Sequence, residues 1–442
     1  MCKRVAVKPV YKTAEPNDGI NVGRLKASLP VGNTPKELDF EAKLRMLPVP
    51  SLVLETQVDV VDAFKLSFSL YQDPARVIEF ADSGTKAEVH LLSTENNRVA
   101  ISPRREPLVI GDPKAKLKRV VFHVLNFWVF DSNWKAHIPS TDRELADHVE
   151  LVGDKHKITI SSLVETRELV KGLRKTSGFG ITHCGEIVAT GSGDLSVKEV
   201  SALLDELHFY LSFARGIRVG IILPVGYDSD GKQVYQEWGA RLCSPWRYVL
   251  AWMNPRRGEA LEEAFPGFHQ MWSQETWHDA LRDAIIWYCT ANAPGVELDT
   301  GIVLAQAALE LLAWTYAVHD KKLFTAKSFK KKRGTAAKKI ETILDGLNLD
   351  NTIPAECADL LALARKHSWP NGPQALTSVR NDIVHPKKDL DPLTHDAAYQ
   401  TRELALRYVE LILLKLFGYS GDYCTRLSQP FVGETKKVPW AT

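Results

Sequence analysis

The hydrophobic pattern changes its period once along the chain, near residue 245, and this change limits the fold more than any other feature. Between about 50 and 240, short segments such as SLVLETQ and RVVFHVLNFWVF are rich in β-branched and aromatic residues, which predicts strands. From about 270 to 420, apolar residues recur every three or four positions, which predicts helices. We therefore expect an α+β protein with a β-rich N-terminal half and a C-terminal all-α helical bundle.

Turn signals and local composition predict where the parts of the chain begin and end. The first segment is polar, with scattered Pro and Gly, and is expected to be irregular. The predicted parts are an irregular N-terminal arm (1–48), a β-rich α+β domain (49–245), a junction (246–269), a helical bundle (270–425) and a C-terminal tail (426–442).

Composition excludes several classes of protein. The chain has 442 residues and a net charge of only +2, so any contact with nucleic acid must use a local basic patch. The six cysteines are scattered and form no CxxC pair, so we expect no metal, no cofactor and no disulfide framework, as in a reducing cytoplasm. The N-terminus lacks the apolar core of a signal peptide. The apolar segment YVELILLKLFGY is shorter than the roughly 20 residues of a membrane helix and contains Lys415, so no membrane span is expected.

The segment SVRNDIVHPKKD, residues 378–389, carries the candidate catalytic residues. A residue that precedes proline avoids the helical region, so the helix is expected to end at or near His385. Asn381 and His385 are four residues apart and lie on one helical face, where the amide could orient the imidazole. Arg380 lies on a neighbouring face, and a histidine at this place could exchange protons near neutral pH.

The same segment has a plain structural interpretation. Arg380 would then be a solvated surface residue and His385 a polar helix terminus, and the spacing of the two residues by itself favours this interpretation.

A family resemblance favours the catalytic interpretation. SVRNDIVHP resembles the R-x4-6-H signature of HEPN domains, which often have a polar residue after the arginine. AQAALELLAW in an early helix and RYVELILLKLFGY in the last helix support the resemblance, which covers residues 270–420. A β-rich half followed by such a bundle is also similar to the layout of ApeA-type anti-phage defence proteins.

The resemblance implies a metal-independent endoribonuclease that acts as a homodimer or a higher homo-oligomer through its HEPN bundle. Two R-x4-H motifs would form one composite site across the interface. Arg380 would bind the scissile phosphate, His385 would move a proton, and Asn381 would position it. The products would be a 2′,3′-cyclic phosphate and a 5′-hydroxyl. The substrate would be RNA, with tRNA among the candidates, cut in abortive infection after the N-terminal sensor or scaffold half binds a phage-derived trigger.

Glu310 falls where such domains often carry a glutamate in an early helix. It lies in the apolar segment AALELLAW, where an unpaired carboxylate would be costly, so we expect a basic or hydrogen-bonding partner, with Arg380 as a candidate. The alternative is a glutamate on the solvated side of its helix, and the two interpretations stand about even.

A basic run, residues 321–339, holds nine lysines and arginines and no acidic residue. Phe324 and Phe329 are interleaved with it, so it could follow phosphates and stack on bases; a plain solvated surface is an equally good interpretation. The residues expected to bind RNA are Lys330, Lys331, Lys332 and Arg333, with Lys387 and Lys388 after the motif.

Two rival functions stay open. The bundle could keep the HEPN shape and bind RNA or a nucleotide without cutting it, or it could serve only in dimerisation and interaction. RNA cleavage by the purified protein would separate the enzyme from both rivals, and RNA binding would separate the rivals from each other.

Overall fold

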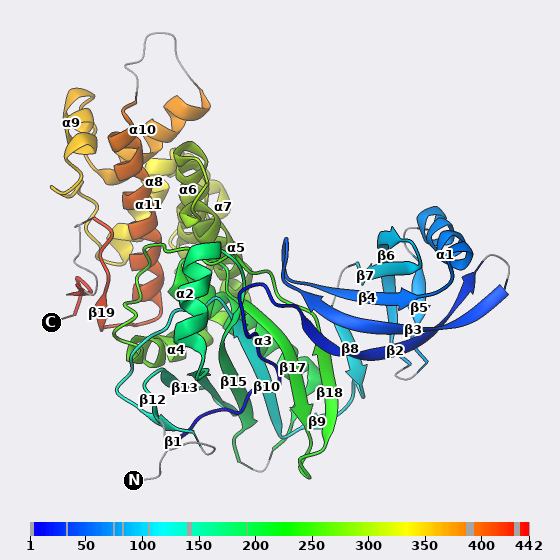
Figure 1. Cartoon of the computed structure of the whole chain (residues 1–442). Coiled ribbons are helices and arrows are strands. Elements are labelled where there is room, and N and C mark those ends of the chain that lie inside the picture. The colour runs from blue at the N-terminus through cyan, green and yellow to red at the C-terminus, as the bar shows by residue number, and fades with distance from the viewer. Residues whose placement is uncertain are drawn as a thin grey trace. The chain divides into compact units, whose positions relative to one another are not determined.

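The structure is a computed structural model that describes residues 4–31, 34–73, 76–81, 84–104, 107–138, 144–191, 193–385, 393–427 and 434–441. The chain divides into two compact units. Unit 1 comprises Met1–Val129, Trp134–His208 and Val219–Arg247, and unit 2 comprises Phe130–Asn133, Phe209–Arg218 and Tyr248–Thr442. Strands dominate the first unit and helices the second, so the expected α+β class is confirmed (Figure 1).

The first sheet of unit 1 has six antiparallel strands in the order β2-β3-β4-β7-β6-β5. A bridge between Ala27 and Phe80 brings β5 back to β2, so the sheet curls until its two end strands meet. Helix α1 (Val60–Gln72) packs on this sheet through Ala63, Leu66 and Leu70. The strands are β2 (Ile20–Val31), β3 (Thr34–Arg45), β4 (Ser51–Gln57), β5 (Val77–Glu79), β6 (Lys86–Glu95) and β7 (Arg98–Pro103).

The expectation of an irregular arm over residues 1–48 is wrong for residues 20–31 and 34–45. These residues form the β2–β3 hairpin, whose side chains alternate between buried and exposed over most of its length. Buried residues such as Leu25, Phe40 and Leu44 point into the core, while charged residues face outward. The alternation has the two-residue period of a strand. Because the segment also contains Pro30, Pro35 and many charged residues, its composition predicted an irregular structure instead.

The second sheet of unit 1 has seven antiparallel strands in the order β13-β14-β15-β10-β17-β18-β8. Helix α2 (Thr166–Thr176) lies between β14 and β15 in the chain, and helix α3 (Val197–Arg215) precedes β17. The strands are β8 (Leu108–Gly111), β10 (Arg119–Leu125), β13 (His148–Val152), β14 (His156–Ser162), β15 (Ile181–Ala189), β17 (Gly220–Tyr227) and β18 (Gln233–Trp238). Short pairings add β1 (Arg4–Val5), β9 (Lys116–Leu117), β11 (Ala136–His137), β12 (Glu144–Leu145) and β16 (Leu195–Ser196).

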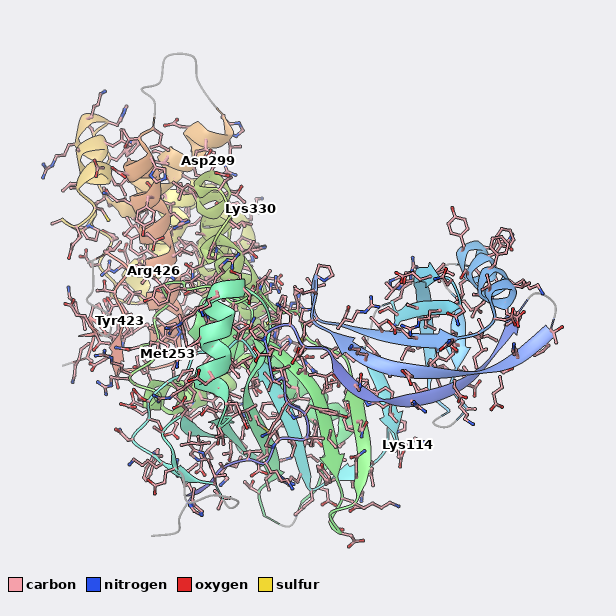
Figure 2. The ribbon with its side chains drawn as sticks, in the orientation of Figure 1. Lys114, Met253, Asp299, Lys330, Tyr423 and Arg426 are labelled. Carbon is pink, nitrogen blue, oxygen red and sulfur yellow. The ribbon has the colours of Figure 1, made fainter. Side chains whose placement is uncertain are left out.

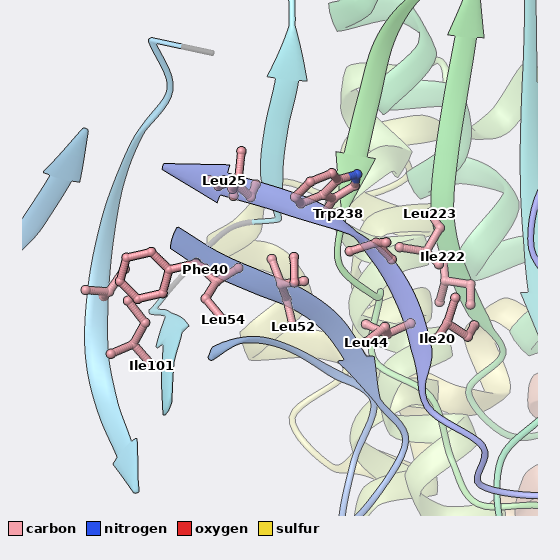
Figure 3. Close-up of a cluster of buried hydrophobic side chains, with 14 of the residues drawn as sticks. Ile20, Leu25, Phe40, Leu44, Leu52, Leu54, Ile101, Ile222, Leu223 and Trp238 are labelled. Carbon is pink, nitrogen blue, oxygen red and sulfur yellow. The ribbon is translucent and has the colours of Figure 1, made fainter. Parts of the chain in front are cut away.

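One hydrophobic core joins the two sheets of unit 1. Ile222 and Leu223 of β17 share a buried cluster with Ile20 and Leu44 of the hairpin (Figure 3). The ring of Trp238 lies against β2 at Gly23, where a β-carbon would collide with the indole. The close contact requires glycine, which also adopts the positive φ of this position without strain.

Unit 2 is a bundle of helices, followed by a short strand pair. The helices are α4 (Glu259–Trp272), α5 (Glu275–Asn292), α6 (Leu298–Trp314), α7 (Ala326–Lys332), α8 (Ala336–Gly346), α9 (Ala358–Lys366), α10 (Gly372–Val384) and α11 (His395–Leu416). A π-helical turn (Thr315–Asp320) extends α6, and the strands β19 (Asp422–Tyr423) and β20 (Lys436–Lys437) pair near the C-terminus. The helices predicted from about 270 to 420 are therefore present.

Arg426 is a buried charge of the bundle, with a side chain that is 1% exposed (Figure 2 labels this residue). Its guanidinium forms ion pairs with Glu403 at 3.0 Å and Glu410 at 2.8 Å, both on α11. Further acceptors come from α5 and from the segment before α4: the side chains of Asn292 and Tyr288 and the main-chain oxygen of Leu250. A single side chain of the C-terminal tail thus ties α5, α11 and residue 250 together.

By length and composition alone, the helical segment Leu298–Asp320 is long and apolar enough to cross a membrane. The bundle buries 61% of its most apolar window. The core helix of a soluble protein has the same length and composition, and the partners of this segment are the other helices of the bundle. The sequence analysis considered YVELILLKLFGY as the candidate for a membrane span, whereas Leu298–Asp320 is the segment with sufficient length and hydrophobicity.

We expect Arg426→Met to lower the free energy of unfolding by about 3–5 kcal/mol, because it leaves two buried carboxylates without a cation. Arg365→Met on the exposed surface of α9 is the control, with an expected change within about 0.5 kcal/mol. Urea denaturation followed by circular dichroism measures both. Equal effects of the two substitutions would contradict a central role for Arg426.

Unit 1 should lose stability as the pH falls from about 6.5 to 4. Burial lowers the pKa of His123 to about 4 and that of His183 to about 3. Below pH 6.5 these histidines are therefore protonated in the unfolded chain but stay neutral in the folded protein. Each histidine then lowers the free energy of unfolding by up to about 1.4 kcal/mol per pH unit. Denaturation at several pH values measures the slope. His123→Gln should reduce it and His395→Gln, at an exposed helix start, should not; an unchanged slope in His123→Gln would refute this.

Candidate nucleic-acid interface and R-x4-H site

Helix α10 carries the candidate catalytic residues, and local sequence signals fix both of its ends. Asn371 caps the first turn by accepting a hydrogen bond from the main-chain N–H of Gln374. At the other end α10 stops at Val384, and His385 is the C-cap residue, as expected for a residue before proline. The buried face of α10 includes Leu376 and Val379 and packs against α6, α8 and α11.

Arg380, Asn381 and His385 lie together at the C-terminal end of α10. Arg380 is half-buried, whereas Asn381 and His385 are exposed. A guanidinium nitrogen of Arg380 donates to the amide oxygen of Asn381 at 3.3 Å, and the main-chain N–H of His385 donates to the main-chain oxygen of Asn381 at 2.8 Å. Arg380 and Asn381 therefore share a side-chain hydrogen bond, whereas His385 is joined to them only through the main chain.

The expected hydrogen bond between the side chains of Asn381 and His385 is not found among the described residues. The amide of Asn381 instead contacts Arg380. Because the backbone of His385 leaves the helix at the cap, its side chain no longer follows the regular one-turn spacing on which the expectation depended. Asn381 thus orients the arginine, and the imidazole of His385 faces solvent.

Glu310 of α6 has a basic partner, but the partner is not Arg380. Its carboxylate accepts from the ammonium group of Lys339 on α8 at 2.8 Å and from the side-chain amide of Gln306 at 3.0 Å. The side chains of Glu310 and Lys339 are 29% and 25% exposed, so water reaches this pair. Glu310 therefore joins α6 to α8, next to the helix that carries Arg380.

The basic run forms an exposed cationic surface on and after α7. Lys330, Lys331 and Lys332 are exposed, and Arg333 is half-buried with its guanidinium 5.8 Å from the ring centre of Phe324. The ammonium of Lys330 lies 6.0 Å from the ring centre of Trp314 (Figure 2 labels Lys330). Such contacts hold cationic side chains over aromatic rings while their charges stay available to solvent.

Base stacking on Phe329 is ruled out, because the bundle buries this side chain completely. Phe329 packs edge-on against Trp314 at 5.6 Å and against Phe324 at 5.5 Å, so it anchors α7 instead of facing a ligand. Phe324 is half-buried. The interleaved phenylalanines thus have a structural role, and the contribution of the surface to RNA binding must come mainly from charge.

Two of the predicted RNA-binding residues, Lys387 and Lys388, lie outside the described residues. Within the described part of the chain, no hydrogen bond, ion pair or ring contact is observed between Lys330–Arg333 and Arg380 or His385. The described histidine, cysteine, aspartate and glutamate residues also contain no group of three or more that could hold a metal ion.

Two features near the basic run were not predicted from the sequence. The indole N–H of Trp314 donates to the imidazole of His319 at 3.0 Å, across the π-helical turn. Lys339, at the end of the run, is bound to Glu310 and is not part of the free cationic surface. Opposite charges in one domain could have suggested the second pairing, but sequence spacing does not specify it.

Comparison with known proteins gives matches over most of the chain. Residues 112–249 match the YopA central domain, and residues 274–437 match the YopA C-terminal domain. Both matches name the same protein. Over 447 aligned residues the chain is 25% identical to the SPbeta prophage-derived uncharacterized protein YopA of Bacillus subtilis (strain 168), and the alignment covers 100% of this chain and 99% of that protein. No solved structure matches the chain significantly.

The C-terminal match encloses all the candidate site residues. Glu310, the basic run and the α10 motif all lie between residues 274 and 437. The central match covers most of the seven-stranded sheet, from β10 to β18. The similarity to YopA therefore reaches both units, and the name of that relative states a prophage origin and no activity.

Proposed function

We propose that the chain is a metal-independent endoribonuclease of the HEPN type that cuts RNA, with tRNA among its substrates, and that protects cells from phage by abortive infection. The observation that carries the proposal is the end of α10, where Arg380 contacts Asn381 and His385 follows one turn later as the exposed C-cap residue. The resemblance of SVRNDIVHP to the HEPN signature gives this group its chemistry. The prophage origin of the YopA relative is compatible with a role in phage biology.

The proposed chemistry needs one cation and one proton carrier from each motif. The guanidinium of Arg380 binds the non-bridging oxygens of the scissile phosphate and stabilises their developing charge. One His385 removes the proton of the 2′-hydroxyl, whose oxygen attacks phosphorus and forms the cyclic phosphate. The bond from phosphorus to the 5′-oxygen breaks, and His385 of the second copy gives that oxygen a proton. The reaction leaves a 2′,3′-cyclic phosphate and a 5′-hydroxyl.

The location of the motif suits a composite site of two copies. A histidine at an exposed helix end can meet a second copy and an RNA strand without unfolding of the bundle. The hydrogen bond from Arg380 to Asn381 favours one position of the guanidinium, which would reduce the entropy that phosphate binding costs. Glu310 acts at a distance, by holding α6 against α8 through Lys339.

We also propose how the enzyme binds RNA, how it is activated and where it acts. The cationic surface of Lys330, Lys331, Lys332 and Arg333 would hold the RNA backbone, and unit 1 would bind a phage-derived trigger that releases activity. The enzyme would work in the cytoplasm, where both phage RNA and tRNA are present. A HEPN-like bundle that binds RNA without cutting, and a bundle that only dimerises, are the alternatives that the first experiment separates.

Arg380→Ala and His385→Ala should each lower the rate of RNA cleavage by a factor on the order of 10²–10⁴, because each removes a group that acts in the transition state. The assay uses purified protein and tRNA in EDTA. The matched controls are Arg365→Ala and His395→Ala, at exposed positions of neighbouring helices, which should cut as wild type does. Circular dichroism checks the fold of each variant.

Other results of this assay would replace the proposal. Cleavage that persists in both motif variants would make Arg380 and His385 ordinary helix residues. RNA binding without cleavage by the wild type would favour the binding module, and neither binding nor cleavage would favour an interaction protein.

Replacement of Lys330, Lys331 and Lys332 by alanine should weaken RNA binding in a salt-dependent way. Each phosphate contact to single-stranded RNA contributes about 0.7 to the slope of log affinity against log salt, so three lost contacts should lower the slope by about 2. Fluorescence anisotropy at several salt concentrations measures the slope. A triple variant at Lys171, Lys175 and Lys198, which are exposed in unit 1, makes the same charge change and should bind as wild type does. Equal slopes in the two variants would remove the basic run from the interface.

A further inference from the structure

The first sheet of unit 1 closes on itself at one point and stays open beyond it. Its end strands, β2 and β5, meet at the bridge between Ala27 and Phe80. Beside the bridge, the main-chain N–H of Ala81 donates to the main-chain oxygen of Lys26 at 2.7 Å. Further along, no pairing of β2 with β5 is observed among the described residues. We call this unpaired boundary, between residues 28–31 of β2 and residues 77–79 of β5, the seam.

The register of the bridge shows how a closed seam would pair. The two strands run antiparallel there, so Ser28 of β2 stands opposite Glu79 of β5. In an antiparallel sheet these two residues would exchange hydrogen bonds, because the bonded pair of Lys26 and Ala81 lies two residues away on each strand. Instead, a hollow of about 660 Å³ lies at this place, lined by residues of both strands. The sheet therefore opens directly after the bridge.

The free edge of β5 points its main-chain groups into the hollow. The main-chain oxygen of Arg76 accepts from the N–H of Val89 on β6 at 2.9 Å. Successive residues of a strand direct their N–H and C=O groups to opposite edges, so Ile78 also bonds toward β6. The groups of Val77 and Glu79 therefore point away from β6, into the seam. This edge offers two donors and two acceptors.

The edge of β2 offers fewer groups. Lys26 directs its main-chain oxygen toward β5, so by the same alternation Ser28 and Pro30 face the seam. Pro30 has no N–H, which leaves one donor, at Ser28, and two acceptors on this edge. Proline on a free edge limits pairing with other strands. A partner in the seam is therefore expected to bond mainly with β5.

The side chains beside the seam indicate which residues a partner strand must carry. Leu29 and Ile78 point from the two strands into the core, at 3% and 1% exposure. Val77 points to the other side and is 62% exposed. Side chains alternate along a strand, and those of neighbouring strands contact each other on each face. A strand paired with β5 is thus expected to place an apolar residue at every second position, beside Ile78 and Leu29.

The row of main-chain groups identifies the class of partner. An extended peptide repeats its donors and acceptors along the chain and can add a strand to such an edge, whereas a helix bonds its main-chain groups internally. The charged side chains that line the hollow already have partners within the chain. Arg76 pairs with Asp73 at 3.3 Å, and Glu79 pairs with Lys86 at 3.0 Å. Recognition by hydrogen bonds of the main chain therefore fits the seam better than recognition by charge.

We propose that the seam binds an extended segment of another protein, which adds a strand to the free edge of β5. The segment carries apolar side chains at alternate positions and bonds chiefly to the main chain of Val77 and Glu79. All residues of the seam belong to unit 1, so binding does not require the proposed nuclease activity. Only the source of the segment rests on the proposed function, in which it belongs to the phage-derived trigger of unit 1.

Selection from a phage-displayed library of linear peptides on the full chain is the first test. Enriched peptides should have apolar residues at every second position. A labelled synthetic copy of the best peptide should then bind the full chain in fluorescence anisotropy. N-methylation of the alternate peptide amides that face β5 keeps the side chains but removes the donors, and should weaken binding at least about tenfold.

Val77→Pro is the matched change in the protein. It removes one N–H that points into the seam and keeps the ladder between β5 and β6, because the first residue of a strand tolerates proline. The affinity for the peptide should fall about tenfold. Val77→Thr keeps the N–H and the β-branched shape and should bind as wild type does. Arg380→Ala should also bind the peptide as wild type does, whether or not the wild type cuts RNA.

Hydrogen exchange at single residues tests the seam without any substitution. In the free chain the amides of Ser28, Val77 and Glu79 should exchange fast, whereas those of Leu29 and Ile78, which bond to β3 and β6, should exchange slowly. The peptide should slow exchange at Val77 and Glu79.

Four results would overturn the proposal. Slow exchange at Ser28 and Glu79 in the free chain would mean that the seam closes by itself. A particle mass in sedimentation velocity that Val77→Pro halves would assign the seam to a second copy. The other two are a library that yields no binding peptide, and peptide binding that Val77→Pro and N-methylation leave unchanged. None of these results depends on RNA cleavage, so failure of this proposal and failure of the nuclease proposal are separate outcomes.

Discussion

The structure of the helical unit depends on one buried cation. Arg426 lies in the interior with two carboxylates of the same helix, Glu403 and Glu410, as its partners. The energetic cost of burying these charges is offset only while all three stay together. Burial raises the pKa of the Glu410 carboxyl, which the guanidinium opposes. Because Glu403 and Glu410 lie two turns apart and bind one guanidinium, α11 cannot slide or rotate without breaking the cluster.

A fixed α11 has consequences for the candidate site. Helix α10 packs on α11, and the two also meet through Tyr408 of α11, which lies so close to Gly372 that a side chain at that position would collide with its hydroxyl. The first turns of α10 are therefore held by packing, while its last turn, with Arg380 and His385, stays accessible. The end of α10 therefore lies on a rigid support and is accessible to solvent. A site that two copies form together and that binds RNA needs both properties.

The sequence predicted those elements whose position depends on neighbouring residues alone. The helices of the bundle follow from 3–4 residue spacing, and the end of α10 at Val384 follows from Pro386. The β2–β3 hairpin was missed because prolines and charges outweighed its alternation, and α1 was missed because it lies in the region where β-branched and aromatic residues predicted strands. The partners of Glu310 and Arg426 lie 29 and at most 176 residues away, and no local pattern specifies such pairs. Likewise, the aromatic residues of the basic run looked available for stacking until packing showed Phe329 to be buried.

The central claim is that Arg380 and His385 cut RNA through its own 2′-hydroxyl. The most direct test is end-group analysis of tRNA that the wild-type protein has cut in EDTA, beside a matched RNA with a 2′-O-methyl group at the cut site. Attack by the 2′-hydroxyl should leave a 2′,3′-cyclic phosphate and a 5′-hydroxyl on the natural RNA, with no cutting at the methylated position. Products with a 3′-hydroxyl and a 5′-phosphate, or equal cutting of the methylated RNA, would contradict it.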